Sequence, residues 1–136
     1  MDFSKENIRY FTNGNWIEYL KYTGLMLIIV SDRHMQSLAG YWQKEEVRIQ
    51  TVIYSDFTLD EINKQINGCY FGLKGDVKKK INALTTHEVQ FLDLAVNGYS
   101  LPVIASQMKL ETKKVYNIKE SVRRKMGINL NQLLSV

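Results

Sequence analysis

The first half of the chain alternates short apolar runs with amphipathic segments, and this alternation predicts parallel strand–helix units. Residues 25–30, 51–54 and 69–73 are almost continuously apolar, which is typical of strands covered on both faces. Between them, residues 34–46 and 59–66 follow a helical pattern. Strands that alternate with helices generally form a parallel sheet, so we expect a small three-stranded sheet flanked by helices.

Two further elements are predicted ahead of and beside this sheet. Residues 8–12 are a candidate short strand, and residues 16–22 are a candidate helix. Trp16, Tyr19 and Leu20 would share one side of that helix, because positions three and four apart are neighbours on a helix surface. Together these elements predict a small α/β module over residues 1–76.

The last third of the chain has a helical pattern throughout. Thr85 and Glu88 have the spacing of a capping box, in which the hydroxyl accepts a backbone N–H and the carboxylate reaches back to the cap. The helix that follows ends at Asn97-Gly98, a common stop signal. Its core-facing positions are Val89, Phe91, Leu92, Ala95 and Val96.

Three more helices follow. Ser100 can cap the second, with Pro102 tolerated in its first turn. The third is predicted over residues 113–126 and ends at Gly127. A short fourth helix carries Leu130, Leu133 and Leu134. Four short helices joined by tight turns predict an all-α helix-turn-helix domain over residues 84–136, so the fold class of the whole chain is α+β.

Many spaced positions of this domain follow one known pattern without a gap. They are Leu84, Thr85, Glu88, Leu92, Ala95, Gly98, Ser100, Ile104, Ala105, Met108, Leu110, Val115, Val122, Lys125, Met126 and Gly127. In these residues the last third of the chain resembles the DNA-binding domain of the LuxR/FixJ/NarL regulators. The resemblance implies a four-helix fold whose third helix enters the major groove of duplex DNA.

Helix geometry independently gives the third helix two different faces. Val115, Ile118, Val122 and Met126 form an apolar stripe that must face the core. The opposite face and its flanks carry six lysines and arginines, which can neutralise phosphates while the polar side chains reach base edges. The candidate DNA-binding residues are Lys113, Lys114, Tyr116, Asn117, Lys119, Glu120, Arg123, Arg124 and Lys125.

Several positions depart from the family pattern. Tyr116 replaces a lysine or small polar residue, Ile118 a histidine, and Glu120 a frequent lysine. A glutamate that faces phosphates is unfavourable unless it accepts a hydrogen bond from a cytosine amino group. Pro102-Val103 replaces the usual Lys-Glu, and the fourth helix, a dimer contact in many relatives, is short. These departures concern sequence specificity and dimerisation rather than the fold.

Residues 8–76 resemble a shortened receiver domain. Asp32 follows a predicted strand in the manner of a phospho-accepting aspartate, and Ser55 and Lys74 end later strands where receivers keep a hydroxyl and a lysine. The paired acids that hold Mg²⁺ are missing, because Asp2 and Glu6 are single acids near the terminus. Phosphoryl transfer lacks its main charge stabilisation without the metal, so we expect Asp32 to be a loop or helix-cap residue.

Composition and charge narrow the class of protein. The longest apolar run, residues 25–30, is far short of a membrane span, and the N-terminus lacks a secretion signal. A single Cys69 fits a reducing cytoplasm. Residues 1–76 carry a net charge of −2 and residues 77–136 a net charge of +6, with a basic linker predicted at 77–83. This asymmetry favours a polyanion as the partner of the second half.

These observations predict a cytoplasmic, bacterial-type transcription regulator that binds double-stranded DNA, as a dimer and without control by aspartyl phosphorylation. The alternative is an interaction protein that pairs with a related regulator through residues 1–76 and reads little DNA sequence itself. Homodimer and heterodimer both remain open. No motif of an enzyme, a cofactor site or a metal site is present in the sequence, so we expect none of these.

Overall fold

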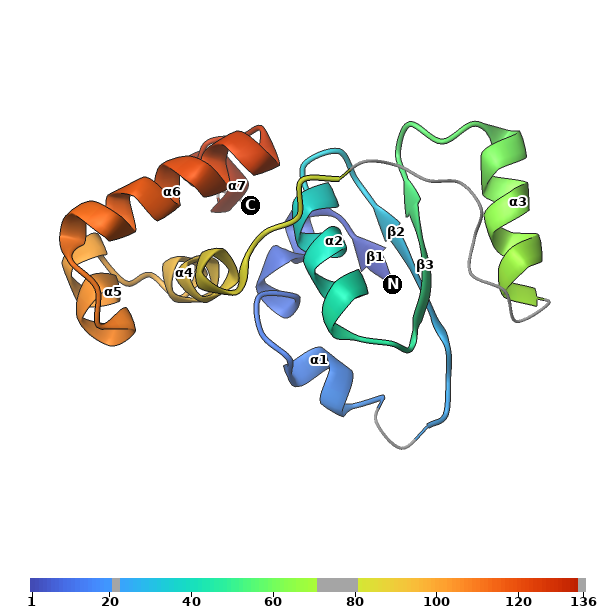
Figure 1. The fold of residues 1–136 in the computed structure, drawn as a ribbon, viewed down its shortest axis with the longest axis horizontal. Coiled ribbons are helices and arrows are strands. Elements are labelled where there is room, and N and C mark those ends of the chain that lie inside the picture. The colour runs from blue at the N-terminus through green and yellow to red at the C-terminus, as the bar shows by residue number, and fades with distance from the viewer. Residues whose placement is uncertain (21–22, 71–80, 135–136) are drawn as a thin grey trace.

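The structure, a computed structural model, describes residues 1–20, 23–70 and 81–134. These residues form a small parallel sheet with helices around it, followed by a group of helices, which is an α+β arrangement (Figure 1). The first half contains β1 (Asp2–Phe3), the 3₁₀ helix η1 (Lys5–Tyr10), α1 (Asn15–Glu18), β2 (Leu27–Ser31), α2 (Gln36–Glu45), β3 (Ile49–Tyr54) and α3 (Leu59–Tyr70). The second half contains α4 (Thr86–Val96), α5 (Leu101–Met108), α6 (Thr112–Met126) and α7 (Leu130–Leu134).

The sheet has the order β1-β2-β3 and both pairings are parallel. β3 is buried along its whole length, as predicted for residues 51–54. The prediction that residues 25–30 are buried throughout is wrong: Leu27 and Ile29 are buried, but Val30 is 52% exposed and Leu25 precedes the strand in an exposed position. Successive side chains of a strand point to opposite faces, and only one face of β2 packs fully into the core.

Two strand predictions in the first half are wrong. Residues 8–12 begin in the 3₁₀ helix η1, where Ile8 is the buried residue. Cys69 belongs to α3, which continues four residues past the predicted helix end at Ile66, and residues 71–73 lie outside the described residues. The third strand of the sheet is instead β1, which at two residues is too short to show an alternating pattern.

The predicted helix at 16–22 is also shorter than expected. α1 ends at Glu18, and residues 21–22 are outside the described part of the chain. Trp16 is buried whereas Tyr19 is 86% exposed, so the two do not share a buried side. The predicted helices at 34–46 and 59–66 are confirmed as α2 and α3 with shifted ends.

Four aromatic side chains from the first half pack against one another in the core: Phe3, Phe11, Trp16 and Trp42. Phe3 stacks on Phe11 with ring centroids 4.0 Å apart, and Trp16 meets Trp42 edge to face at 5.5 Å. The indole N–H of Trp42 donates a hydrogen bond to the Phe11 carbonyl at 2.7 Å. Edge-to-face and offset pairs of this kind stabilise beyond their area burial, so η1, α1 and α2 are fixed to the sheet together.

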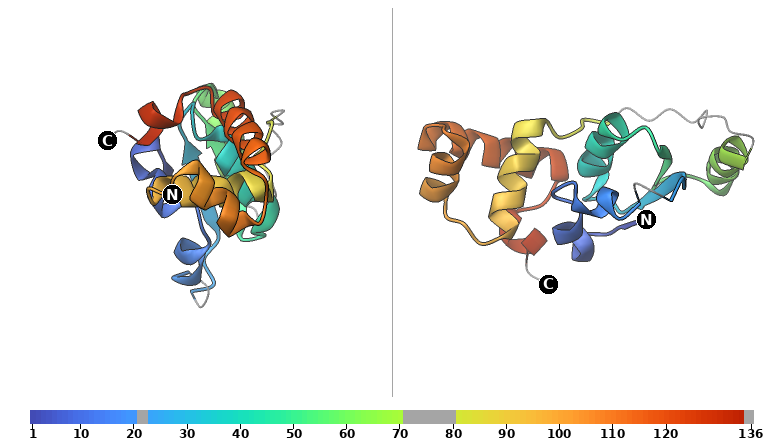
Figure 2. Two further views of the ribbon diagram at one scale, coloured as in Figure 1. Left: turned by 90° about the vertical axis from the view of Figure 1, so that its left-hand side faces the viewer. Right: turned by 90° about the horizontal axis from the view of Figure 1, so that it is seen from below.

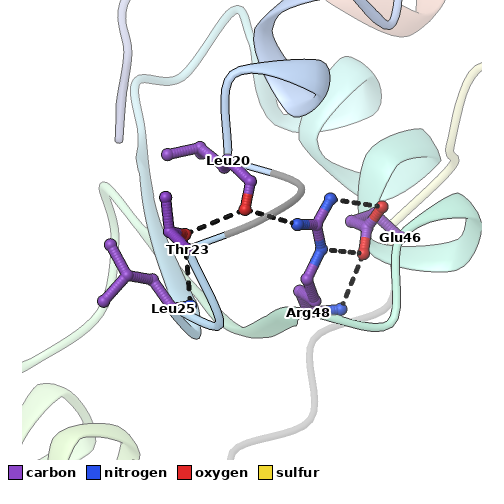
Figure 3. Close-up of polar contacts among 5 residues, drawn as sticks. All are labelled: Leu20, Thr23, Leu25, Glu46 and Arg48. Atoms are coloured by element: carbon purple, nitrogen blue, oxygen red, sulfur yellow. Dashed lines mark hydrogen bonds and ion pairs between the residues drawn. The ribbon is translucent and has the colours of Figure 1, made fainter.

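A small polar cluster joins the loop before β2 to the loop before β3 (Figure 3). The Arg48 guanidinium forms an ion pair with Glu46 at 2.9 Å and donates to the Leu20 carbonyl at 2.7 Å. The Thr23 hydroxyl donates to the same carbonyl at 2.8 Å. Hydrogen bonds from the Arg48 side chain and backbone lower the pKa of Glu46, so the pair stays charged and holds the two loops together.

The helices of the second half follow the sequence predictions closely. The capping box is confirmed: Thr85 accepts from the Glu88 backbone N–H, and Glu88 accepts from the Thr85 N–H at 2.8 Å. Asn97 and Gly127 end α4 and α6 as predicted, with Gly127 in the left-handed region at φ 69°. Ser100 stands at the N-cap of α5, although its hydroxyl makes no capping hydrogen bond there.

The two halves share one core. Buried side chains of both form a single cluster, and α4, α6 and α7 lie on the η1 and α2 side of the sheet, with α5 beyond them and α3 at the opposite end (Figure 2). Ile81 and Ala83 pack against Gly40 of α2, where an added Cβ would come within 3.0 and 3.1 Å of their side chains. The predicted linker thus packs against α2 from residue 81 onward, and its residues 77–80 lie outside the described residues.

No helix in the described ranges is long and apolar enough to cross a membrane.

Candidate nucleic-acid interface

Helix α6 is fixed by its buried stripe. Val115 and Val122 are 0% exposed and Met126 is 2% exposed, while Ile118 is half-buried, so the predicted core stripe is confirmed. The helix packs against α4 and α5 on this side. Burying a branched aliphatic side chain stabilises by about 1.5–3 kcal/mol, so the rotation of α6 about its axis is strongly determined. Its remaining side chains must therefore face outward.

The short turn between α5 and α6 sets the angle between these helices. Lys109 ends α5 in the left-handed conformation at φ 57° and donates its backbone N–H to Ser106 at 3.2 Å. The Leu110 N–H donates to the Ala105 carbonyl at 3.0 Å, and Leu110 packs on the core. Glu111 then stands at the N-cap of α6 in an extended conformation. These contacts fix where α6 starts.

The outer side of α6 is basic. Lys113, Lys114 and Arg124 are exposed, and Lys119 is half-buried. Among the described residues, no ion pair or hydrogen bond engages the side chains of these four. Tyr116 is 52% exposed and Asn117 is exposed beside it. The structure therefore presents free cations together with an aromatic ring and an amide on one accessible surface.

Glu120, the acid that departs from the family pattern, is paired with a cation on its own helix. Its carboxylate meets the Arg123 guanidinium at 3.1 Å, with side chains 37% and 45% exposed. A pair this exposed contributes little to stability. The pair does offset the negative charge of Glu120. Glu120 therefore repels a nearby phosphate less than an unpaired glutamate would.

Lys125 does not join the outer surface. Its ammonium lies 2.6 Å from a carboxylate oxygen of Glu88 and 3.2 Å from the Ala83 carbonyl, and its side chain is 15% exposed. The other oxygen of Glu88 accepts from the Ser121 hydroxyl at 2.5 Å. The position of Lys125 therefore does not support the expectation that it acts on phosphates.

The carboxylate of Glu88 is stabilised in its charged form. Burial alone would raise its pKa, but hydrogen bonds from Lys125, Ser121 and the Thr85 backbone outweigh burial and hold the pKa below its usual value. This buried network joins the start of α4 to the end of α6.

The first half of the chain also holds the C-terminal end of α6. The Ser37 hydroxyl donates to the Lys125 carbonyl at 2.8 Å, and the Nδ1 atom of His34 lies 3.1 Å from the Met126 carbonyl. These carbonyls are among the last of the helix, which have no partner within it.

The first half also contacts α4. The Asp93 carboxylate of α4 accepts hydrogen bonds from the Thr12 hydroxyl at 2.8 Å and from the Asn13 side-chain amide at 3.2 Å. Sequence reasoning missed these contacts, because residues that far apart leave no periodic signal.

Asp32 acts as a structural cap. One carboxylate oxygen accepts the backbone N–H groups of His34 and Met35, both at 2.9 Å, and the other accepts the Lys5 N–H at 2.7 Å. The aspartate therefore joins the end of β2, the start of α2 and η1. Its geometry agrees with the expected loop or cap role. Ser55 is exposed at the end of β3, and Lys74 lies outside the described residues.

Comparison with known families identifies the first half of the chain. The family described as "EcpR N-terminal domain" matches residues 1–70, which include the whole sheet, α2 and α3. The chain belongs to the EcpR family. A curated relative, described as the uncharacterized protein YqeH of Escherichia coli (strain K12), is 36% identical across 98% of this chain. The chain spans 63% of the length of that relative.

Solved structures similar to this EcpR-family chain share its fold. One is described as two RcsB dimers bound to two parallel DNAs, with a TM-score of 0.51 and 19% identity over 87% of this chain and 62% of that one. Another is RcsB from Salmonella enterica serovar Typhimurium bound to promoter rprA, with a TM-score of 0.50 and 19% identity over the same shares of the two chains. At this identity the likeness shows the fold alone.

Proposed function

We propose that the chain is a DNA-binding transcription regulator that places α6 in the major groove of duplex DNA. The observation that carries this proposal is the set of cations on the outer side of α6 that have no side-chain partner among the described residues, opposite the buried stripe of the helix. Membership of the EcpR family and the shared fold with DNA-bound RcsB support it. The resemblance of α4–α7 to the LuxR-type helix-turn-helix domain supports it independently, and we place the activity in the cytoplasm.

The outward side chains divide by chemistry into two groups. Lysines and arginines at the helix ends and flanks fit phosphates, which position the protein without reading sequence. The central side chains Tyr116, Asn117 and Glu120 fit base edges. Lys113, Lys114, Lys119 and Arg124 form the first group, and Arg123 joins them while it also holds Glu120. Lys125 takes a structural role instead, through its pairing with Glu88.

A salt titration of the full chain on duplex DNA tests the proposal. Replacing Lys113 or Lys114 with alanine should weaken binding to all sequences and reduce the salt slope by about one unit, because each lysine neutralises one phosphate. Fluorescence anisotropy between 50 and 200 mM salt would measure this. Lys44→Ala, at an exposed position of α2 in the first half, is the matched control and should leave the slope unchanged. An equal effect of all three substitutions would contradict the proposal.

We further propose that the chain binds DNA as a dimer. A single reading helix contacts one half-site, and useful specificity usually needs two half-sites about one helical turn apart. Pairing through the first half is the expected arrangement, because Leu25, Met26 and Val30 expose apolar side chains there. Sedimentation of the chain with a duplex carrying two sites should give two copies per duplex, and one copy at saturation would contradict it.

We also propose that aspartyl phosphate does not regulate this chain. Among the described residues, the backbone N–H groups of Lys5, His34 and Met35 donate to both oxygens of the Asp32 carboxylate, so phosphorylation of either oxygen would disturb at least one of these hydrogen bonds. Acetyl phosphate with Mg²⁺ should leave the mass and the DNA affinity of the chain unchanged. A gain of one phosphoryl group that is lost in Asp32→Asn would refute this.

The alternative function is pairing with a related regulator through residues 1–76, with little DNA reading. The exposed apolar side chains of Leu25, Met26 and Val30, each more than half exposed, favour such an interface. The salt titration separates the two functions, because an interaction protein would show no salt-dependent DNA binding by itself.

A further inference from the structure

Tyr116 stands out on the outer side of α6 because it is large, partly apolar and accessible. It is 52% exposed, although the helix around it is packed closely on its other side. It lies next to Asn117 and one turn before Glu120, on the half of α6 nearer the N-terminus. Base edges are contacted by this half of a recognition helix. An exposed aromatic ring here is therefore within the part of the surface that would meet bases.

The charged side chains around Tyr116 indicate which kind of partner could bind this surface. Lys113 precedes it by three residues, on the same side, and Asn117 presents an uncharged amide beside it. Glu120, the acid on this side, is paired with Arg123 at 3.1 Å. A polyanion whose groove offers both apolar and hydrogen-bonding groups fits this surface. An apolar protein partner would leave the surrounding unpaired cations desolvated, which is unfavourable.

The major groove of DNA exposes one apolar group, the 5-methyl group of thymine. A tyrosine ring can pack on that methyl group with its face or edge, whereas the lysine or small polar residue usual at this position cannot bury it to the same extent. Asn117 fits the adjacent adenine edge, to which an amide can make two hydrogen bonds. The two neighbouring side chains therefore fit a sequence that contains A·T pairs.

We propose that Tyr116 is a specificity-determining residue that selects a thymine through its 5-methyl group. This inference rests on the proposed DNA-binding function and adds the chemical group that is recognised. Removing one buried methyl group costs about 0.8 kcal/mol, so loss of the contact should weaken binding about fourfold. Replacing thymine by deoxyuridine removes only this methyl group and keeps the base pair.

The experiment uses the full chain and a duplex enriched from a random pool by its binding to the chain. Each thymine of that duplex is replaced in turn by deoxyuridine, and affinity is measured by anisotropy at fixed salt. We expect a loss of about fourfold at one position of each half-site for the unsubstituted chain. The same replacement should have no effect on Tyr116→Ala, whose exposed position leaves the fold intact by circular dichroism. Tyr19→Ala, which removes an exposed tyrosine of the first half, should keep the full loss.

The outcomes separate this inference from the proposed function. Salt-dependent binding that is unaffected by deoxyuridine at every thymine would overturn the role of Tyr116 and leave the DNA-binding function standing. An equal loss in the unsubstituted chain and Tyr116→Ala would assign the methyl contact to another side chain and also overturn it. The absence of binding to any duplex at low salt would reject the DNA-binding function itself.

Discussion

Replacing Glu88 with alanine should lower the free energy of unfolding by about 3 kcal/mol, because it leaves the largely buried Lys125 ammonium without its carboxylate. It also removes the acceptor of the Ser121 hydroxyl and half of the capping box of α4. Urea denaturation followed by circular dichroism would measure the change. Glu120→Ala is the matched control, since it breaks an exposed pair on α6, the helix that carries Lys125, and should cost less than about 1 kcal/mol.

The same network predicts a dependence of stability on pH. The pKa of Glu88 is held below its usual value in the folded chain, so its contribution is fully present above that usual value. The contribution is lost as the pH falls through the lowered pKa, where the folded carboxylate takes up a proton. Glu88→Gln should therefore show a flatter loss of stability on acidification than the unsubstituted chain. Parallel acid profiles for the two proteins would contradict this account of the network.

The contact between the two halves should stabilise the proposed DNA-binding surface of α6. We expect a fragment of residues 77–136 to be monomeric, less stable than the same helices in the full chain and weaker in DNA binding. It loses the donors from Ser37, Thr12 and Asn13, each hydrogen bond being worth about 1 kcal/mol. It also exposes the part of the shared core that α2 covers. Hydrogen exchange of α6 amides in the fragment and in the full chain would measure the difference.

A substitution in the full chain tests the same contact without removing the first half. Gly40→Val should separate residues 81–83 from α2, because even a Cβ at this position comes within 3.1 Å of Ala83. It should increase exchange at the C-terminal end of α6 and leave its N-terminal half unchanged. Gly14→Ala is a control at a glycine with open space around it. Unchanged exchange in both Gly40→Val and the fragment would show that the halves fold independently.

The sequence predicts a helix best where its periodic apolar pattern is accompanied by start and stop residues within the same segment. α4 and α6 were predicted nearly to the residue, because capping residues, apolar stripes and terminal glycines all agree there. β1 escaped prediction because two residues carry no period, and the strand at 69–73 was predicted from an apolar run that begins inside α3. Local pattern does not distinguish a short buried strand from the end of a helix.

In the candidate interface, too, the features that depend on local helix geometry were predictable and those that depend on distant residues were not. The outward positions of Lys113, Tyr116 and Asn117 follow from helix geometry alone, and the structure agrees with them. The inward position of Lys125 depends on Glu88, which is 37 residues away, and on the fold that brings them together. Asp32 was recognised as a structural residue from what its surroundings lack, but its partner Lys5 could be found only from the pairing of β1 with β2.

Site-specific cross-linking shows which helix of the chain lies in the major groove. A photoreactive side chain at position 117, on the outer side of α6, and one at position 43, exposed on α2, are compared in the full chain on the same enriched duplex. We expect covalent adducts at one base per half-site from position 117, on atoms of the major groove, and none from position 43. Adducts from position 43 with none from position 117, while the chain still binds the duplex, would contradict the placement of α6 in the groove.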